Sequence, residues 1–154
     1  MMGKTHMAIG FLAGVLLFSV VDANPVVFVP LVVLGSLLPD VDHENSKINR
    51  LVPVTRWVPK FFKHRGFFHS VFPALILYTV SYATGTLVLG MPVVLGYLAH
   101  LFSDCFTRLG CNLLHPLSTL RVQGFLMTGG ITEAVVLIVV WSANVVLVVK
   151  KLGI

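Results

Sequence analysis

The chain has 154 residues, of which 56% are hydrophobic and only 11% are charged, whereas soluble domains carry about 25% charged residues. This composition excludes a disordered chain and a disulfide scaffold, and it leaves too little charged surface to cover a water-soluble globule. The net charge of +5 is not placed on a polar domain, so we expect no nucleic-acid partner. The sequence predicts a small integral membrane protein.

Apolar stretches alternate with short polar segments along the whole chain. They cover residues 7–21, 26–38, 66–89, 91–106 and 131–149. The first two are short for crossing a bilayer, since about 15 helical residues rise roughly 22 Å against a hydrocarbon core of about 30 Å. The third, which contains Gly85, and the fifth are long enough to cross alone. We therefore expect a single domain over residues 1–154, an all-α membrane bundle with four or five transmembrane helices.

Positive charge is distributed unevenly between the two sides of this bundle. With five spans, one side holds nine Lys and Arg residues, six of them in the loop 43–65, and the other side holds only Lys150 and Lys151. Cytoplasmic loops carry the excess of positive charge. We therefore expect a multi-pass inner-membrane or plasma-membrane protein whose N-terminus faces the cytoplasm. The two C-terminal lysines either snorkel at the far interface or indicate that the fifth stretch does not span.

The loop 43–65 mixes aromatic and basic residues. Trp57 and Phe61 alternate with Arg56 and Lys60, and prolines at 53 and 59 prevent one long helix. This pattern is typical of a cytoplasmic interfacial segment that contacts the anionic headgroups of membrane lipid. The alternative is a plain basic loop that only sets orientation.

Almost all His and acidic residues sort to one end of the predicted bundle. In an up-down bundle, the starts of odd helices and the ends of even helices lie on one side, here the positively charged side. Asp22 alone is left at the other end. Such residues at membrane depth are costly and indicate function. Those on the positive side are His6, Asp40, Asp42, His43, His64, His69, His100, Asp104 and Glu133.

Two spacings favour a metal site within this set. His100 and Asp104 are four residues apart, so they share one helix face, and Gly96 would let another helix approach that face. His6 continues into a stripe with Gly10 and Gly14, which would point it into the bundle. Taken singly, each feature also fits a hydrogen bond or helix packing. Together, imidazole and carboxylate suit zinc or another divalent first-row ion.

Four segments of the chain resemble motifs of a known family. Residues 37–43 resemble its LLPDIDH motif, residues 64–70 its HRGxTHS motif, residues 96–104 its GYLxHxxxD motif, and residues 128–133 its TGxxxE pattern. On these motifs the chain resembles the YdjM-type family of inner-membrane, metal-dependent hydrolases. One departure is Phe68, where the family usually has Thr, so a role for that hydroxyl in substrate binding does not carry over.

The resemblance implies a set of metal ligands. The family is distantly similar to zinc-dependent phospholipases C and single-strand-specific nucleases, which bind clustered metals through a His-x-x-x-Asp helix. This implies that His100 and Asp104 are ligands, and it suggests His6 and Asp40. His64 and His69 both fit the remaining histidine, and we favour His69.

We therefore expect a hydrolase that cleaves a phosphoester in a lipid or lipid-linked substrate with metal-activated water at the cytoplasmic interface. Zinc is the expected ion, as one or more ions, with manganese as the alternative. Asp42, His64 or Glu133 would orient water, protonate the leaving group or complete a second metal. Arg65 and Arg108 would hold the anionic phosphate. The alternatives are a metal or proton transporter and a non-enzymatic metal-binding membrane protein.

Overall fold

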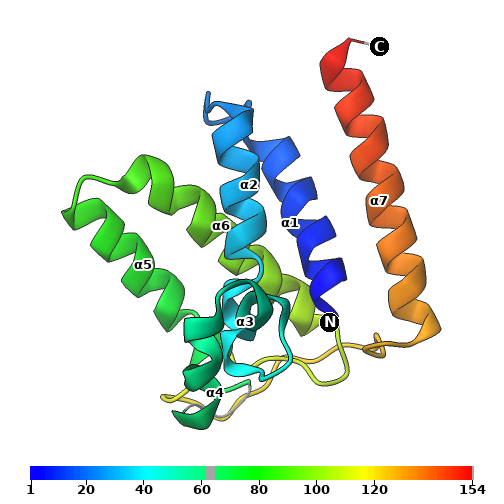
Figure 1. The fold of residues 1–154 in the computed structure, drawn as a ribbon. Helices are drawn as coiled ribbons and strands as arrows, with labels where there is room; N and C mark the ends of the chain where they lie inside the picture. Colours follow the sequence, from blue (N-terminus) through cyan, green and yellow to red (C-terminus); the bar gives the residue numbers. More distant parts are fainter. Residues whose placement is uncertain (62–64, 154) are drawn as a thin grey trace.

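The computed structural model describes residues 1–61 and 65–153, and helices dominate it. Within these ranges the chain forms seven α-helices, three short 3-10 helices and two isolated β-bridges. Some of the long apolar helices stand roughly upright beside one another and others run obliquely next to them, and the short helices gather at one end (Figure 1). The predicted all-α bundle is therefore confirmed. The long helices are α1 (Gly3–Leu17), α2 (Pro25–Gly35), α5 (Phe72–Ala83), α6 (Leu87–Cys105) and α7 (Ile131–Leu152).

Three segments of the described residues are long and apolar enough to cross a membrane: Pro25–Asp42, Leu87–Cys105 and Ile131–Leu152. The other two apolar helices, α1 and α5, are shorter. Helix α7 runs without a break from the end of the bundle that holds the N-terminus to the opposite end (Figure 1). Its last turn carries Lys150 and Lys151, so these lysines lie far from the N-terminus, as snorkelling at the far interface requires.

The third apolar stretch does not form one long helix, contrary to the prediction. Helix α5 ends at Ala83, Gly85 adopts a φ of +70°, and α6 begins at Leu87. Glycine reaches this left-handed conformation without steric cost, and it commonly ends a helix there. The 12 residues of α5 rise only about 18 Å, so the stretch is divided between two helices, and α5 by itself is shorter than a hydrocarbon core of about 30 Å.

Glycines bring α1, α2 and α6 into close backbone contact. A Cβ atom added to Gly96 would lie 1.9 Å from the carbonyl oxygen of Val32, and one added to Gly10 would lie 2.6 Å from Ser36 Oγ. Both contacts exclude any larger side chain. The packing role expected for Gly96 and Gly10 is therefore confirmed. As a result, the end of α2 at Ser36 is pressed against α6 one turn from His100.

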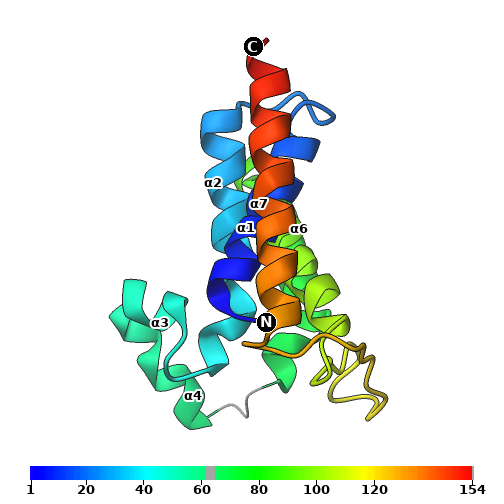
Figure 2. The same cartoon turned by 90° about the vertical axis from the view of Figure 1, so that its right-hand side faces the viewer.

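Helix α7 lies alongside α1 in both views (Figures 1 and 2). Buried Asn144 donates a hydrogen bond of 3.0 Å from Nδ2 to the carbonyl oxygen of Ala8. At the start of α7, Glu133 accepts a hydrogen bond of 2.6 Å from Thr5 Oγ1. These two polar contacts are about three turns apart in α7 and about one turn apart in α1, and they hold two otherwise apolar helices in one register.

The loops collect at the end of the bundle where α1 and α7 begin and α6 ends (Figure 1). Buried Asn49 organises one of them, because its Nδ2 donates to the carbonyl oxygens of Val41 at 3.0 Å and His43 at 2.9 Å. Thr55 Oγ1 in turn donates to Asn49 Oδ1 at 2.6 Å. The loop elements are η1 (Leu38–Asp42), α3 (Lys47–Leu51), η2 (Pro53–Trp57), α4 (Val58–Phe61) and η3 (Phe67–His69).

Candidate metal centre

Five His and Asp side chains from four separate segments meet at the loop end of the bundle. Their ligand atoms form two groups, each with all atoms within 4.8 Å of one another, and both groups include His100. Helix α1 supplies one residue, the 3-10 helices η1 and η3 supply one each, and α6 supplies two. The groups are His6, His100 and Asp104, and Asp40, His69 and His100.

The distances between the ligand atoms suit a shared ion. Asp104 Oδ1 lies 3.5 Å from His6 Nε2, and Asp104 Oδ2 lies 3.7 Å from His69 Nε2 and 3.8 Å from His100 Nε2. Asp40 Oδ1 lies 3.7 Å from His69 Nε2 and 3.8 Å from His100 Nε2. Two ligands at about 2.1 Å from one tetrahedral ion are about 3.4 Å apart. A small inward shift of these side chains would therefore complete a coordination shell.

The imidazoles of His100 and His6 present their Nε2 atoms to the centre. His100 Nδ1 lies 2.8 Å from the carbonyl oxygen of Ser36, which can only accept, so the proton sits on Nδ1. His6 Nδ1 lies 3.0 Å from Ser103 Oγ, whose hydroxyl already donates to the carbonyl oxygen of His100 at 2.8 Å. Ser103 therefore accepts from His6 Nδ1, and each Nε2 keeps its lone pair.

The environment of these two Nε2 atoms indicates a ligand that is not part of the chain. Both are buried, and neither has a hydrogen-bond partner among the residues that the structure describes. A buried polar atom without a partner is costly, and metal-ligating histidines characteristically use their other ring nitrogen in such hydrogen bonds. The residues present therefore fit a metal ion. The analysis of the sequence did not identify Ser36 or Ser103, although Ser103 stands one helical turn after His100.

His69 is held from behind by Asp42. Its Nδ1 lies 3.2 Å from Asp42 Oδ2, in the carboxylate–histidine arrangement found behind many metal ligands. Burial by itself would lower the pKa of His69, but the nearby carboxylates of Asp40, Asp42 and Asp104 together outweigh burial and raise the pKa to about 9. A metal must therefore displace a proton from this ring at neutral pH. Asp42 itself faces the ring and is in neither ligand group.

Arg65 lies at the edge of the centre, as expected. Its Nη2 lies 3.2 Å from Asp104 Oδ2, and its backbone N–H donates to Asp42 Oδ2 at 3.1 Å. A second side-chain nitrogen donates to the carbonyl oxygen of Gly110. Arg65 adopts a φ of +61°, a conformation that costs a non-glycine residue free energy and that clusters at functional sites. The surrounding contacts hold it there.

Arg108 and Glu133 do not join the centre. Within the described residues, Arg108 has an exposed side chain and no ion pair or hydrogen bond to the five ligands. Glu133 Oε1 accepts from the Met2 backbone N–H and from Thr5 Oγ1, and its Oε2 accepts from the Gly129 backbone N–H, each at 2.6 Å. Oε1 thus ties α7 to the start of α1, and Oε2 binds the segment that precedes α7. The structure places Glu133 outside both ligand groups.

One residue of the predicted site, His64, lies outside the described residues. The Met1 amine lies 2.5 Å from Asp104 Oδ1, so this carboxylate has cationic neighbours on both oxygens. The two ligand groups share His100, whose Nε2 has one lone pair and can bind only one ion at a time.

Comparison with known proteins identifies a matching family profile and several related proteins. A family profile described as "YdjM inner membrane protein" matches residues 1–152. YvsG of Bacillus subtilis is 33% identical over 144 residues, which cover 89% of this chain and 88% of that protein. Inner membrane protein YdjM of Escherichia coli is 37% identical over 95 residues, which cover 57% of this chain and 48% of that protein. No solved structure matches the chain.

Proposed function

Since this chain belongs to the YdjM family of inner membrane proteins and gathers five His and Asp side chains at one end of its bundle, we propose that it is a membrane-bound, metal-dependent hydrolase. Its substrate is a phosphoester in a membrane lipid or a lipid-linked molecule. The observation that carries the proposal is the pair of buried Nε2 atoms, on His6 and His100, that face two carboxylates and lack a hydrogen-bond partner among the described residues.

The five ligands leave one side of the centre accessible. The side chains of His6, His69, His100 and Asp104 are at most 1% exposed, whereas those of Asp40 and Arg65 are 16% and 11% exposed. A substrate must therefore approach past these two residues. A centre that admits a substrate is characteristic of catalytic sites, whereas structural zinc sites are closed.

The residues around the centre have distinct tasks in this mechanism. When bound, the divalent ion would supply Lewis acidity and a hydroxide nucleophile at neutral pH. Arg65, at the accessible edge, presents a planar cationic fork that binds phosphate oxygens. Asp42 keeps the His69 ring oriented. Ser36 and Ser103 do the same for His100 and His6.

The position of the centre favours a lipid substrate. Trp57 and Phe61 are 62% and 78% exposed, and Lys60 Nζ lies 4.2 Å from the centroid of the Trp57 ring. These residues belong to η2 and α4, at the same end of the bundle as the start of α1 (Figure 2). Aromatic and basic side chains of this kind partition into the headgroup layer. The segment would place the centre at the depth of the phosphoester bonds of membrane lipids.

The same placement argues against a transporter. Transport sites usually lie near the bilayer midplane, whereas the described ligands lie at one end of the helices. Within residues 1–61 and 65–153, Asp22 is the only carboxylate in the opposite half of the bundle. A relay of ionisable residues across the membrane is therefore not formed by the described part of the chain.

Metal content and lipid hydrolysis of the detergent-purified full chain test the proposal together. Wild type should hold about one zinc or manganese by elemental mass spectrometry and should release phosphorylated headgroups or phosphate from phospholipid vesicles, with the activity lost in a chelator. Asp104→Asn should lose the metal and lower turnover by at least ~100-fold, because it removes a charged ligand. Asp22→Asn, at the other end, should match wild type.

Two results would contradict this function. Protein that takes up no metal after zinc or manganese is added would overturn the metal centre. Stoichiometric metal without hydrolysis of any phosphomonoester or phosphodiester lipid would instead support the non-enzymatic alternative. Circular dichroism of Asp104→Asn, compared with wild type, separates loss of ligand from loss of fold.

A further inference from the structure

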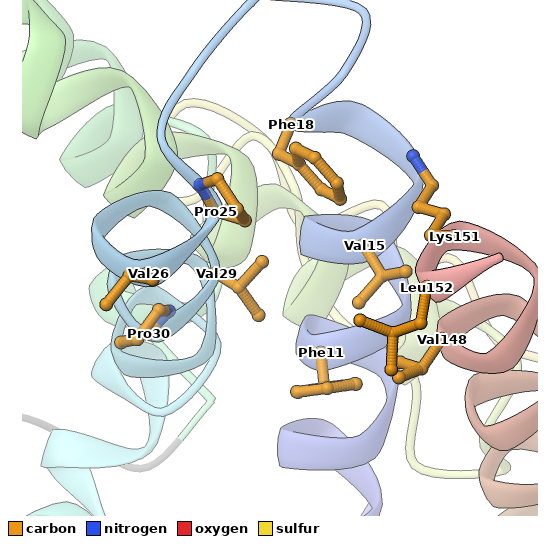
Figure 3. Close-up of a pocket in the computed structure, with 10 residues that line it drawn as sticks. All are labelled: Phe11, Val15, Phe18, Pro25, Val26, Val29, Pro30, Val148, Lys151 and Leu152. Carbon is orange, nitrogen blue, oxygen red and sulfur yellow. The ribbon is translucent and has the colours of Figure 1, made fainter. Parts of the chain in front are cut away.

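A large apolar cavity lies in the half of the bundle away from the metal centre. It has a volume of about 600 Å³ and lies between α1, α2 and α7. Figure 3 shows side chains from all three helices around one space, among them Val15 of α1, Val29 of α2 and Val148 of α7. Sites for small molecules typically have volumes of about 300–1,000 Å³. The cavity is therefore large enough for a ligand and is separate from the proposed active site.

The cavity is open toward the surface of the bundle that faces lipid. Val26 and Leu152, which line it, are 79% and 68% exposed. Helix α7 contributes one wall and is weakly packed, with 11% of its span buried against 50% for the span of α6. Apolar cavities of this kind stay free of water. In a bilayer, the hydrocarbon chains of the lipids would therefore fill this cavity.

A positively charged group is held at the far end of the cavity. Lys151, which also lines it, places Nζ 2.6 Å from Ser19 Oγ and 4.0 Å from the centroid of the Phe18 ring. These contacts, drawn in part in Figure 3, fix a long side chain that is otherwise flexible. Lys150 precedes it in the same turn of α7, and Asp22 is the only described acid in this half of the bundle. The mouth of the cavity thus combines an apolar wall with a net positive charge.

We propose that this cavity binds one acyl chain of an anionic phospholipid from the leaflet opposite the metal centre. Lys151 pairs with the phosphate at the interface, and the chain descends between α1, α2 and α7. The bound chain would complete the contact between α7 and the other helices in the half of the bundle where protein side chains leave it open. This lipid site is independent of the proposed hydrolysis, because its residues and the ligand residues lie at opposite ends.

Native mass spectrometry of the delipidated full chain tests the proposal. The protein is titrated with phosphatidylglycerol and, separately, with phosphatidylcholine. We expect one tightly retained phosphatidylglycerol, with phosphatidylcholine retained at least several-fold less. Val148→Trp, which fills the cavity, should remove the retained lipid. Val149→Trp is the matched control, because residue 149 is the next position of α7 and does not line the cavity.

The headgroup contact is tested by a second pair of variants that lie at the exposed end of α7. Lys151→Gln should abolish the preference for phosphatidylglycerol, whereas Lys150→Gln should retain it. Equal lipid retention by Val148→Trp and Val149→Trp would overturn the cavity site. A dimer in the wild-type spectrum that Val148→Trp abolishes would show that a second copy of the chain, and not a lipid, covers this face. Metal content measured on the same samples reports separately on the other end of the molecule.

Discussion

His69 illustrates how a single side chain in this centre depends on its neighbours. One ring nitrogen faces Asp42, which is not a proposed ligand, and the other faces Asp40 and Asp104, which are. The carboxylate behind the ring makes the imidazole more basic and holds its orientation. Asp42 is therefore a positioning residue in our interpretation, and its effect should be measurable without any knowledge of the substrate.

Asp42→Asn should weaken metal binding while leaving the fold intact. The amide keeps the size of the side chain but removes the negative charge behind His69, and substitution of such partners typically lowers metal affinity about 10–100-fold. Competition with a fluorescent zinc chelator gives the affinity. Glu44→Gln, an exposed acid two residues further along the same loop, is the control and should bind like wild type. Unchanged affinity in Asp42→Asn would show that the contact with His69 does not support the metal.

The sequence predicted that five ligand candidates and Arg65 lie together, because ionisable residues are rare in the chain and carry motif spacing, and the structure brings these six side chains together. The remaining predictions show the limit of this reasoning. Glu133 also sorts to the correct end, yet its two oxygens are occupied by the starts of α1 and α7. Arg108 is close to Asp104 in sequence but is exposed. Glu133 and Arg108 differ from the residues that gather at the centre only in the direction of their side chains. The order of residues along the chain does not contain this information.

At the scale of the helices, the position of His100 depends on how closely α2 and α6 approach. The carbonyl oxygen of Ser36 at the end of α2 fixes the His100 ring. The same two helices touch at Gly96, one turn earlier in α6, where a Cβ atom would meet the backbone of Val32 at 1.9 Å. The packing of α2 against α6 and the position of the His100 ring therefore depend on the same helix interface.

Gly96→Val should therefore affect both stability and metal binding. Overpacking typically costs about 1–3 kcal/mol, and here the clash is with backbone, so α2 must move and carry Ser36 away from His100. Thermal unfolding in detergent should show a lower midpoint, and zinc affinity should fall with it. Val88→Leu, on the exposed side of the same helix, adds a methylene group without a clash and should leave both unchanged. Full zinc affinity in Gly96→Val would separate the interface from the centre.

On the scale of the whole molecule, charge and topology together predict an orientation. The N-terminus and the basic loop lie at one end, and the C-terminus lies at the other (Figure 1). Among the described residues, eight Lys and Arg residues lie toward the first end, and Lys150 and Lys151 lie at the second. From the positive-inside rule we therefore predict that the candidate metal centre faces the cytoplasm and that the apolar cavity lies near the opposite face.

Reporter fusions check this orientation. Alkaline phosphatase, which is active only outside the cytoplasm, should be active when fused after Leu152, and green fluorescent protein at the same position should be dark. Fusions placed in the loop near Leu117, at the metal-centre end, should show the reverse. A fluorescent C-terminal fusion would contradict the predicted topology, and it would place the metal centre on the outer side.

The sequence by itself determined the membrane class, the all-helical architecture and the end of the bundle where the His and Asp side chains gather. These properties follow from composition, from the length of apolar stretches and from the scarcity of charged residues, all of which are local or additive. The break at Gly85, the structural use of Glu133, the hydrogen bonds from Ser36 and Ser103, and the apolar cavity were decided only by the tertiary structure. Each depends on which atoms from distant segments come together, because directional contacts arise from packing and not from residue order.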